Sequence, residues 1–501
     1  MFLPGKQRVN DTRYRSYLRE RYRCLGGYTG VLFCFIGLLI TAPAGLVLFF
    51  PSEKAMTAGF LWPGLTMILL GAVLRITFGC KESDTLSIAE GAVIVLVAWI
   101  GAIIAGAVPF YWGGLTLTQA VFEATSGWTT TGLTVVNVAQ ASPLLLFFRS
   151  LMQLAGGAGL AIIMLSALGG SAGVGLSTAE GRADQLVPQI RQSVRLVLKL
   201  YSLYVLAGVA ALKLAGMTWF EAVNHAFCAV STGGFSTRTE SIGFWNSPAI
   251  EAVLIVLMLL GSTNFLTIYT LGRGRLDAVV GNGELRVTAG IVPVAAVVLC
   301  FSLIPQAYGY CPDSLRVAVF QTVTSLTTTG FETAPLADWN GSGWLAVIML
   351  MLVGGGTGST AGGIKQHRMY LLIKGLKKEF TEIFFSPRVI TEQKFWLGSQ
   401  QRFVRERDLR KACQYMALYL LTWLAGGCAL AAFGHPVADS LVEFASALGT
   451  VGLSVGVTTA AAPAGQLWIE IAGMFLGRLE FFVIFWGVVK IGKDLLRVSR
   501  P

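Results

Sequence analysis

The stretch FEATSGWTTTGLT, residues 122–134, recurs in altered form three more times along the chain. The related segments are NHAFCAVSTGGFS (224–236), FQTVTSLTTTGFE (320–332) and VEFASALGTVGLS (442–454). Aligned on one glycine, all four have threonine two positions earlier and a large apolar residue one position later. Nine positions before the glycine each has a polar residue, namely Glu123, His225, Gln321 and Glu443. Four matches in register indicate a repeated unit.

The sequence around these segments is typical of a membrane protein. Of its 501 residues 54% are hydrophobic and only 13% are charged, whereas ordinary globular chains carry about 25% charged residues. Apolar runs such as 30–50, 91–108, 249–261 and 481–492 recur along the chain. Because about 20 apolar residues cross the hydrocarbon core of a bilayer, the sequence predicts a polytopic membrane protein. The basic start lacks the features of a cleavable signal peptide.

Each repeated segment lies between two long apolar runs. The part before each glycine is about ten residues long, or about 15 Å as a helix, which is half a bilayer. Non-helical backbone at that depth is tolerated only where it is buried or lines a wet cavity. We therefore expect an all-α membrane protein with two N-terminal helices and four span–pore-loop–span repeats. The repeats would surround a pseudo-four-fold central pore, giving ten membrane crossings.

The expected parts follow the repeats along the chain. They are a basic cytoplasmic tail (1–24), a two-helix unit (25–82), pore repeat 1 (83–175), pore repeat 2 (176–275), pore repeat 3 (276–375), a cytoplasmic linker (376–411) and pore repeat 4 (412–501).

Positive charges support this topology. Lys and Arg gather in the first 23 residues and on the predicted inner side, at Arg182, Arg191, Arg195, Arg273, Arg275, Arg286, from Lys374 to Lys411, and at Lys493, Arg497 and Arg500. This asymmetry predicts that both termini are cytoplasmic. The net charge of +11 is thus an orientation signal, and nucleic-acid binding is not expected.

The glycine segments have the chemistry of a monovalent-cation filter. Backbone carbonyls can replace the hydration shell of an ion, and glycine lets the chain turn them inward. A short helix pointing its C-terminal end at the pore would favour a cation. The expected filter residues are Thr130, Thr131, Gly132, Leu133, Thr232, Gly233, Gly234, Phe235, Thr328, Thr329, Gly330, Phe331, Thr450, Val451, Gly452 and Leu453. Glu123, His225, Gln321 and Glu443 are expected to anchor these loops by hydrogen bonds.

Other classes of chemistry have little support. The glycine-rich stretch VGGGTGSTAGGIK (353–365) does not match a phosphate-binding loop, because glycine does not directly precede its lysine. No nucleophile–base pair or metal-ligand cluster is apparent, so no catalytic residues and no covalently bound cofactor are expected. The eight cysteines form no CxxC pair and are interpreted as small hydrophobic residues.

Together, the four TxG segments and the glycine-rich stretch resemble the Trk/Ktr/HKT superfamily of potassium transporters, specifically the bacterial TrkH/TrkG type. The resemblance implies a K⁺-selective filter, tolerant of Rb⁺, in the bacterial inner membrane. In plant relatives that pass Na⁺ a serine replaces the first filter glycine, whereas this chain has Gly132. The resemblance also implies a homodimer and a cytosolic TrkA-like ring of nucleotide-binding subunits, which the basic linker could contact.

A gate is also implied, because in this superfamily a glycine-rich intramembrane loop interrupts the second span of the third repeat. The matching residues are Gly354, Gly355, Gly356, Thr357, Gly358, Ser359, Thr360, Ala361, Gly362 and Gly363, followed by Lys365. Glycine costs about 1 kcal/mol in a helix, so six glycines in this stretch favour a broken span over a helix-packing motif.

Three charged residues outside the repeats' shared pattern stand out. Arg478 lies inside an apolar run, where a charge is functional by default, and the resemblance places it beside the pore near the gate. Two other arrangements are open for Arg478: an ion pair with the nearby Glu480, or a lipid-facing side chain that extends to the membrane surface. Arg149 is expected near the outer interface. Glu332 would either give the outer vestibule a negative field or be a solvated loop charge.

Alternatives to a potassium uptake protein remain at this stage. A secondary transporter of another family, which moves a monovalent cation by symport with Na⁺ or H⁺, would also have membrane spans surrounding a binding site at the midplane of the bilayer. Such proteins often have paired inverted repeats and ionisable residues at the midplane, whereas here four repeats share one orientation and the filter positions are neutral.

Overall fold

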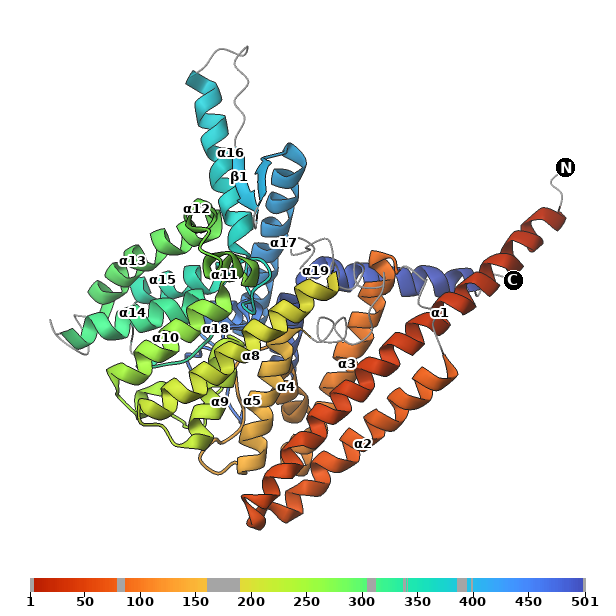
Figure 1. Cartoon of the computed structure of the whole chain (residues 1–501), viewed down its shortest axis with the longest axis horizontal. Helices are drawn as coiled ribbons and strands as arrows, with labels where there is room; N and C mark the ends of the chain where they lie inside the picture. The colour runs from red at the N-terminus through yellow and green to blue at the C-terminus, as the bar shows by residue number, and fades with distance from the viewer. Residues whose placement is uncertain are drawn as a thin grey trace. The chain divides into compact units, whose positions relative to one another are not determined.

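The computed structural model describes residues 4–78, 86–159, 190–303, 312–336, 339, 341–384, 394–397 and 400–498. Their regular secondary structure is almost entirely helical (Figure 1). The chain forms two compact units, one of residues 1–113, 159–195 and 479–501 and one of residues 114–158 and 196–478. Of the positive charges expected on the inner side, Arg182 and Arg500 lie outside the described residues.

The first unit is built on a helical hairpin. α1 (Pro4–Thr41) and α2 (Lys54–Thr77) are joined by the short 3-10 helices η1 (Ala42–Leu48) and η2 (Pro51–Glu53), and α3 (Ile88–Trp112) packs against both. Gly30 faces Gly71 and Gly37 faces Gly64, so that a Cβ on any of them would meet the partner's carbonyl oxygen. Small residues at such contacts let membrane helices approach closely.

One cysteine of this unit differs from expectation. Cys24 is disulfide-bonded, so its interpretation as a free small hydrophobic residue was wrong. The other described cysteines carry free thiols. These are Cys34, Cys228, Cys300, Cys413 and Cys428.

The second unit contains the four repeated segments, and each forms a short helix that ends just before its glycine. These helices are α4 (Leu117–Trp128), α9 (Trp219–Val230), α14 (Pro312–Leu326) and α18 (Val437–Gly449). With 12 to 15 residues each, they are too short for a hydrocarbon core of about 30 Å. α4 and α9 begin with capping boxes, Thr116 with Gln119 and Thr218 with Glu221, which fix where each helix starts.

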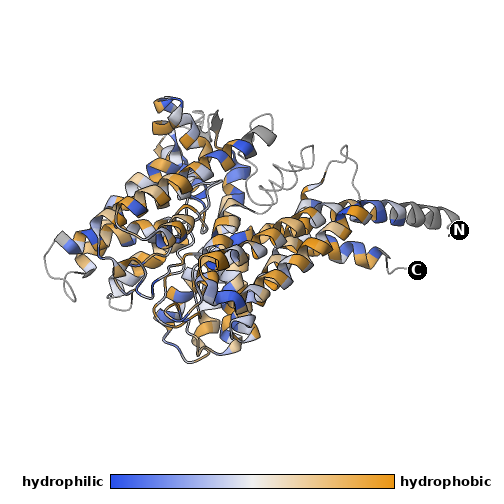
Figure 2. Ribbon diagram, turned by 60° about the horizontal axis from the view of Figure 1, so that its bottom comes forward, coloured by the Kyte–Doolittle hydropathy of each residue, from blue (hydrophilic) through white to orange (hydrophobic). Residues whose placement is uncertain are grey.

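Further helices precede and follow these segments. Those that precede are α8 (Ile190–Leu214), α13 (Gly283–Leu303) and α17 (Glu406–Ala431), and those that follow are α5 (Pro143–Ala158), α10 (Pro248–Ser262), α15 (Gly341–Leu352) and α19 (Ala464–Val498). α19 is interrupted at Glu480, which has non-helical backbone angles of φ 51° and ψ 126°. The apolar colouring of the long helices is evident in Figure 2.

The described residues contain seven helices that are long and apolar enough to cross a membrane. The count is eight if α10 and α11 (Phe265–Gly272), which are bent by 107° at their junction, form one span. The chain is thus a multi-pass helical membrane protein, and the ten crossings stay a prediction.

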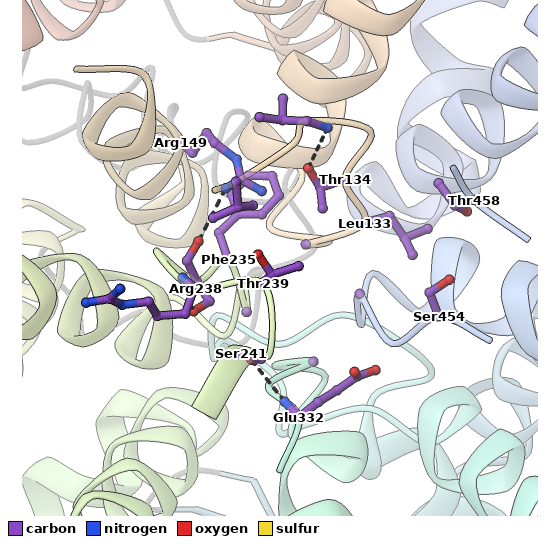
Figure 3. A pocket seen from close by; sticks show the side chains of 17 residues that line it. Leu133, Thr134, Arg149, Phe235, Arg238, Thr239, Ser241, Glu332, Ser454 and Thr458 are labelled. Carbon is purple, nitrogen blue, oxygen red and sulfur yellow. Dashed lines mark hydrogen bonds between the residues drawn. The ribbon is translucent and has the colours of Figure 1, made fainter. Parts of the chain in front are cut away.

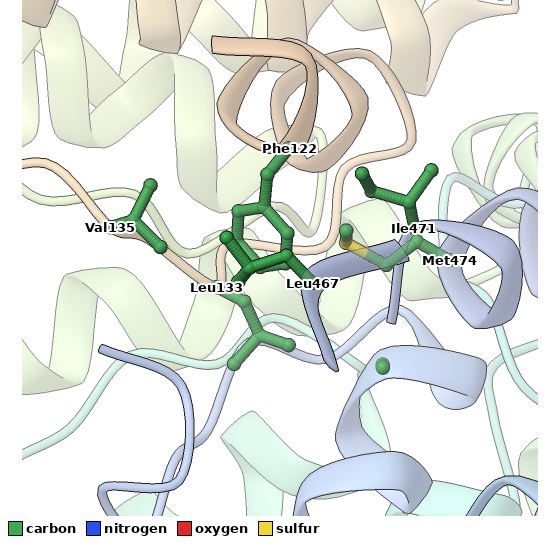
Figure 4. Close-up of a cluster of buried hydrophobic side chains, with 7 residues drawn as sticks. Phe122, Leu133, Val135, Leu467, Ile471 and Met474 are labelled. Atoms are coloured by element: carbon green, nitrogen blue, oxygen red, sulfur yellow. The ribbon is translucent and has the colours of Figure 1, made fainter. Parts of the chain in front are cut away.

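The first and fourth repeats share a core. Phe122, Leu133 and Val135 from the first repeat pack with Leu467, Ile471 and Met474 of α19 and with Ala447 of α18 (Figure 4). Each of these side chains is at most 8% exposed. This contact brings the first and last glycine segments of the sequence together.

The linker region is not entirely helical. After α12 (Leu276–Gly281) and α16 (Gln366–Phe384), β1 (Lys394–Leu397) pairs antiparallel with β2 (Gln400–Phe403). The register pairs Lys394 with Phe403. This pair of strands departs from the all-helical expectation, and the sequence patterns used above do not detect strands of four residues.

Candidate functional site: a ring of four glycine loops

Each repeated segment carries the same backbone strain. The threonine two positions before the glycine has a left-handed backbone in all four repeats: φ is 57° at Thr130, 52° at Thr232, 54° at Thr328 and 51° at Thr450. For a β-branched residue this conformation is a genuine outlier. Strain of this kind persists only where the surrounding structure holds it, and it gathers at functional sites. The four segments are therefore alike in backbone as well as in sequence.

The four glycine loops touch in a closed ring. Each glycine has a positive φ and lies against the carbonyl oxygen that precedes the glycine of the next repeat, so a Cβ there would collide with that oxygen. The contacts are Gly132 with Gly233, Gly234 with Thr329, Gly330 with Val451, and Gly452 with Thr131. The fourth loop thus returns to the first. Only glycine meets both demands, a positive φ and a close approach.

Buried polar residues of the short helices hold the chain that leaves the ring. Glu123 accepts from the Thr134 hydroxyl at 2.9 Å, and Glu443 accepts from the Ser454 hydroxyl at 2.7 Å. His225 Nε2 lies 3.0 Å from the equivalent Ser236 hydroxyl. Three of the four expected anchors therefore make the same contact: the residue nine positions before the glycine binds the hydroxyl of the residue two positions after it. The fourth, Gln321, makes no hydrogen bond through its amide group among the described residues.

Arg149, which the sequence analysis expects near the outer interface, has a buried side chain. Its Nε donates to Glu123 Oε1 at 2.7 Å, with side chains 1% and 0% exposed, and its guanidinium lies 3.9 Å from the Phe235 ring centre. It also donates to the Ser236 carbonyl at 3.3 Å. The sequence could not show this, because the burial comes from the second repeat packing over the first.

Removing Arg149 is expected to destabilise the protein strongly. In Arg149→Met the Glu123 carboxylate would stay buried without its partner, which costs about 3–5 kcal/mol in comparable pairs. Thermal unfolding in detergent measures the loss. Arg238→Met is the matched control, because Arg238 pairs with Glu221 at 2.6 Å but its side chain is 43% exposed. Equal unfolding temperatures for the two variants would contradict the buried pair's role.

A cavity of about 250 Å³ opens on one side of the ring (Figure 3). Its lining includes all four ring glycines, together with Arg149, Arg238 and Glu332. Glu332 is half-buried, and its backbone N–H donates to the Ser241 hydroxyl at 3.2 Å. The cavity thus opens directly onto the ring glycines, and charged side chains of both signs line it.

The glycine-rich stretch 354–363 is a buried irregular loop between α15 and α16. Its backbone is held at both ends, since Gly354 N–H donates to the Ile364 carbonyl at 3.0 Å and Gln366 N–H to the Gly355 carbonyl at 3.0 Å. It lies directly against the strained threonines. Gly362 N–H donates to the Thr328 hydroxyl at 2.8 Å, the Thr360 hydroxyl is 3.2 Å from that of Thr232, and a Cβ on Gly362 would meet the Thr450 hydroxyl.

Two positively charged side chains donate hydrogen bonds to carbonyl groups of this loop. Arg478 Nη1 donates to the Thr360 carbonyl at 3.0 Å, and its Nη2 donates to the Gly156 carbonyl at the end of α5. Lys365 Nζ donates to the Ala361 carbonyl. The structure thus places Arg478 between the loop and the first repeat, and positive charge lies beside the threonine side of the ring.

Two contacts of the loop were not anticipated from the sequence. Thr357 N–H donates to Glu284 Oε1 at 2.8 Å, and Gly356 N–H donates to the Ser262 carbonyl at 2.8 Å. Ser262 ends α10 at the sharp bend before Asn264, which caps α11 through a bond to Leu266 N–H. The sequence GSTN (261–264) was the available signal for this break, because Ser, Thr and Asn favour caps over helix interiors.

Known proteins resemble the chain over most of its length. A family model described as "Cation transport protein" (TrkH) matches residues 58–271 and 304–491. The Trk system potassium uptake protein TrkH of Escherichia coli K12 is 32% identical over 81% of this chain and 86% of its own length. The TrkG protein of the same organism is 29% identical over 91% and 95%, respectively.

A solved structure agrees with these sequence relatives. The crystal structure of the potassium transporter TrkH from Vibrio parahaemolyticus superposes with a TM-score of 0.81 at 26% identity. The match covers 93% of this chain and 98% of that one. With the glycine ring and the buried loop in place, and with this match over nearly the whole length, the chain belongs to the TrkH family of cation transport proteins.

Proposed function

We propose that this chain takes up K⁺ across the bacterial cytoplasmic membrane through the ring of four glycine loops. The observation that carries the proposal is the closed ring of contacts between glycines and carbonyls. It runs from the contact of Gly132 with the Gly233 carbonyl around to the contact of Gly452 with the Thr131 carbonyl. Rings of backbone carbonyls replace the hydration shell of a monovalent cation. The transported ion would be the metal held at the filter residues, with Rb⁺ as a tolerated substitute.

The surroundings of the ring suit a cation. The four short helices end at the strained threonines, so their C-terminal, partly negative ends lie at the ring. The hydroxyls of Thr130 and Thr450 are buried and have no hydrogen-bond partner among the described residues, which leaves them free as oxygen ligands. The relatives named above as potassium uptake proteins support K⁺ as the ion.

The loop 354–363 acts in this proposal as the gate. It is irregular backbone at the level of an apolar span, which is tolerated only where it is buried or faces a wet path. Its contacts with Thr232, Thr328 and Thr450 would close the route beyond the ring. Arg478 would hold the loop there and add an electrostatic barrier to cations.

Topology and partners complete the proposal. Two N-terminal helices and four span–loop–span repeats would give ten crossings, and the charge asymmetry supports cytoplasmic positions for both termini. The basic linker 376–411 would then be cytoplasmic and available to a TrkA-like ring of nucleotide-binding subunits, with the nucleotide bound to that ring and not to this chain. A homodimer is proposed from family resemblance.

The alternative is a secondary transporter that couples the same ion, or Na⁺, to a cation gradient. The two proposals differ in energetics, since a filter passes ions down their own gradient while a symporter moves them against it. The neutral side chains at the filter positions favour the filter.

Rb⁺ uptake into K⁺-depleted proteoliposomes tests the proposal. The purified chain should take up Rb⁺, excess external K⁺ should compete, and equal Na⁺ should compete far less. The assay is repeated with the cytosolic ring and nucleotide added, because a closed gate would mask uptake by the chain alone. Absence of uptake in both conditions, or equal competition by Na⁺, would contradict a K⁺-selective filter.

A further inference from the structure

Gln153 of α5 reaches out of the first repeat to the filter loop of the second. Its Nε2 donates to the Gly233 carbonyl at 2.5 Å, and its Oε1 accepts from Phe235 N–H at 3.2 Å. The side chain is fully buried. The amide nitrogen and the amide oxygen of Gln153 thus bind the two peptide groups that flank Gly234.

The Gly233 carbonyl is one of the four that form the ring. The other three belong to Thr131, Thr329 and Val451, and in the described part of the chain none of them accepts a hydrogen bond. One carbonyl of the ring is therefore fixed by a protein donor while three are left to an ion. Because the donor is a neutral amide on a helix, it sets the direction of that carbonyl without adding charge.

The sequence of the second loop fits around this side chain. A Cβ on Gly233 would collide with Gln153, whose Cδ, Oε1 and Cγ are the nearest atoms to it. In the first and third repeats the matching residue is threonine, held by a threonine hydroxyl two positions earlier, at 2.7 Å for Thr129–Thr131 and 2.8 Å for Thr327–Thr329. Gln153 supplies from another repeat the support that the second loop lacks.

The other repeats show that packing alone does not require glutamine here. Gly156, Gly261 and Gly477 each lie against the carbonyl four residues before the filter glycine of their own repeat, which marks them as equivalent positions. Three residues before each of them stand Gln153, Met258 and Met474, respectively, all buried. Methionine fills the same volume without making either hydrogen bond.

We propose that Gln153 is a specificity-determining positioning residue, which fixes the second filter loop through the Gly233 carbonyl and the Phe235 amide. A filter whose oxygens keep their positions when the ion changes can discriminate between cations by size. Loosening one loop of four lets the ring adapt to a smaller, more strongly hydrated ion such as Na⁺. The inference rests on the proposed function, since it concerns the selectivity of that filter.

The test compares Gln153→Met with wild type in Rb⁺ uptake under Na⁺ competition. Losing two buried hydrogen bonds is expected to lower the preference for Rb⁺ over Na⁺ by about tenfold while the protein stays folded. Met474→Leu, at the equivalent position of the fourth repeat, should keep wild-type selectivity. Unchanged selectivity in Gln153→Met would overturn the inference, whereas absence of uptake by wild type both with and without the cytosolic ring and nucleotide would instead refute the proposed function.

A double-mutant cycle decides the matter if Gln153→Met does not fold. Gly233→Ala should abolish uptake, because its Cβ meets Gln153, although its backbone has no positive φ that would exclude alanine. In the Gln153→Ala background that space is open, so the double variant should recover uptake with low selectivity. Failure of the double variant to recover uptake would show that Gly233 is not shaped by Gln153.

Discussion

Replacing Gly330 with alanine is expected to reduce Rb⁺ uptake at least tenfold. The backbone at Gly330 has φ 84°, a conformation that costs about 1–2 kcal/mol for a residue with a Cβ. The new Cβ would also collide with the Val451 carbonyl, so the third and fourth loops would have to separate. Initial uptake rates in proteoliposomes, normalised to folded protein, measure the effect.

Gly341→Ala is the matched control for this variant. Gly341 begins α15 in the same repeat, and a Cβ there meets no atom within 4 Å. It should leave uptake unchanged. Wild-type uptake by Gly330→Ala would mean that the ion path does not pass between the third and fourth loops.

The second large effect is expected at Arg478, where substitution should increase uptake. Arg478→Ala removes the donor to the Thr360 carbonyl and a positive charge beside the threonine side of the ring. Both changes favour passage of a cation, the first by freeing the loop and the second by removing repulsion. Basal Rb⁺ uptake without any cytosolic partner should rise several-fold.

Arg478→Lys separates the two contributions, because lysine keeps the charge but cannot bind two carbonyls in a fixed fork. An intermediate rate is expected. A fall in uptake in Arg478→Ala, with the protein still folded, would contradict the role of this arginine as a closing element.

The glycine loops could be found from the sequence because their requirements are local. A positive φ and a close backbone approach at Gly132, Gly234, Gly330 and Gly452 can be met by one residue type only, so the pattern is visible in each repeat. Family membership followed from the same segments. The break at 354–363 was also detectable, because so many glycines cannot form a stable span.

Features that depend on contacts between repeats could not be predicted. The left-handed backbone of Thr130 and its three equivalents has no signature in the residue itself, because threonine does not favour it. The burial of Arg149 could not be predicted, since nothing in its own repeat shows that Phe235 would cover it. Gln153 lies in a run of largely apolar residues, and its partners lie some 80 residues further along the chain, so nothing local indicates its role.

The central claim, a K⁺-selective filter made by the four loops, is tested most directly by reversal potentials with K⁺ on one side of a planar bilayer and Na⁺ on the other. The current through the wild-type protein should reverse at a potential far from zero, with the sign that indicates a preference for K⁺. Gly132→Ser, whose side chain would meet the Gly233 carbonyl, should shift the reversal potential toward zero as Na⁺ gains access. A wild-type reversal potential near zero, or one that Gly132→Ser does not move, would contradict the account.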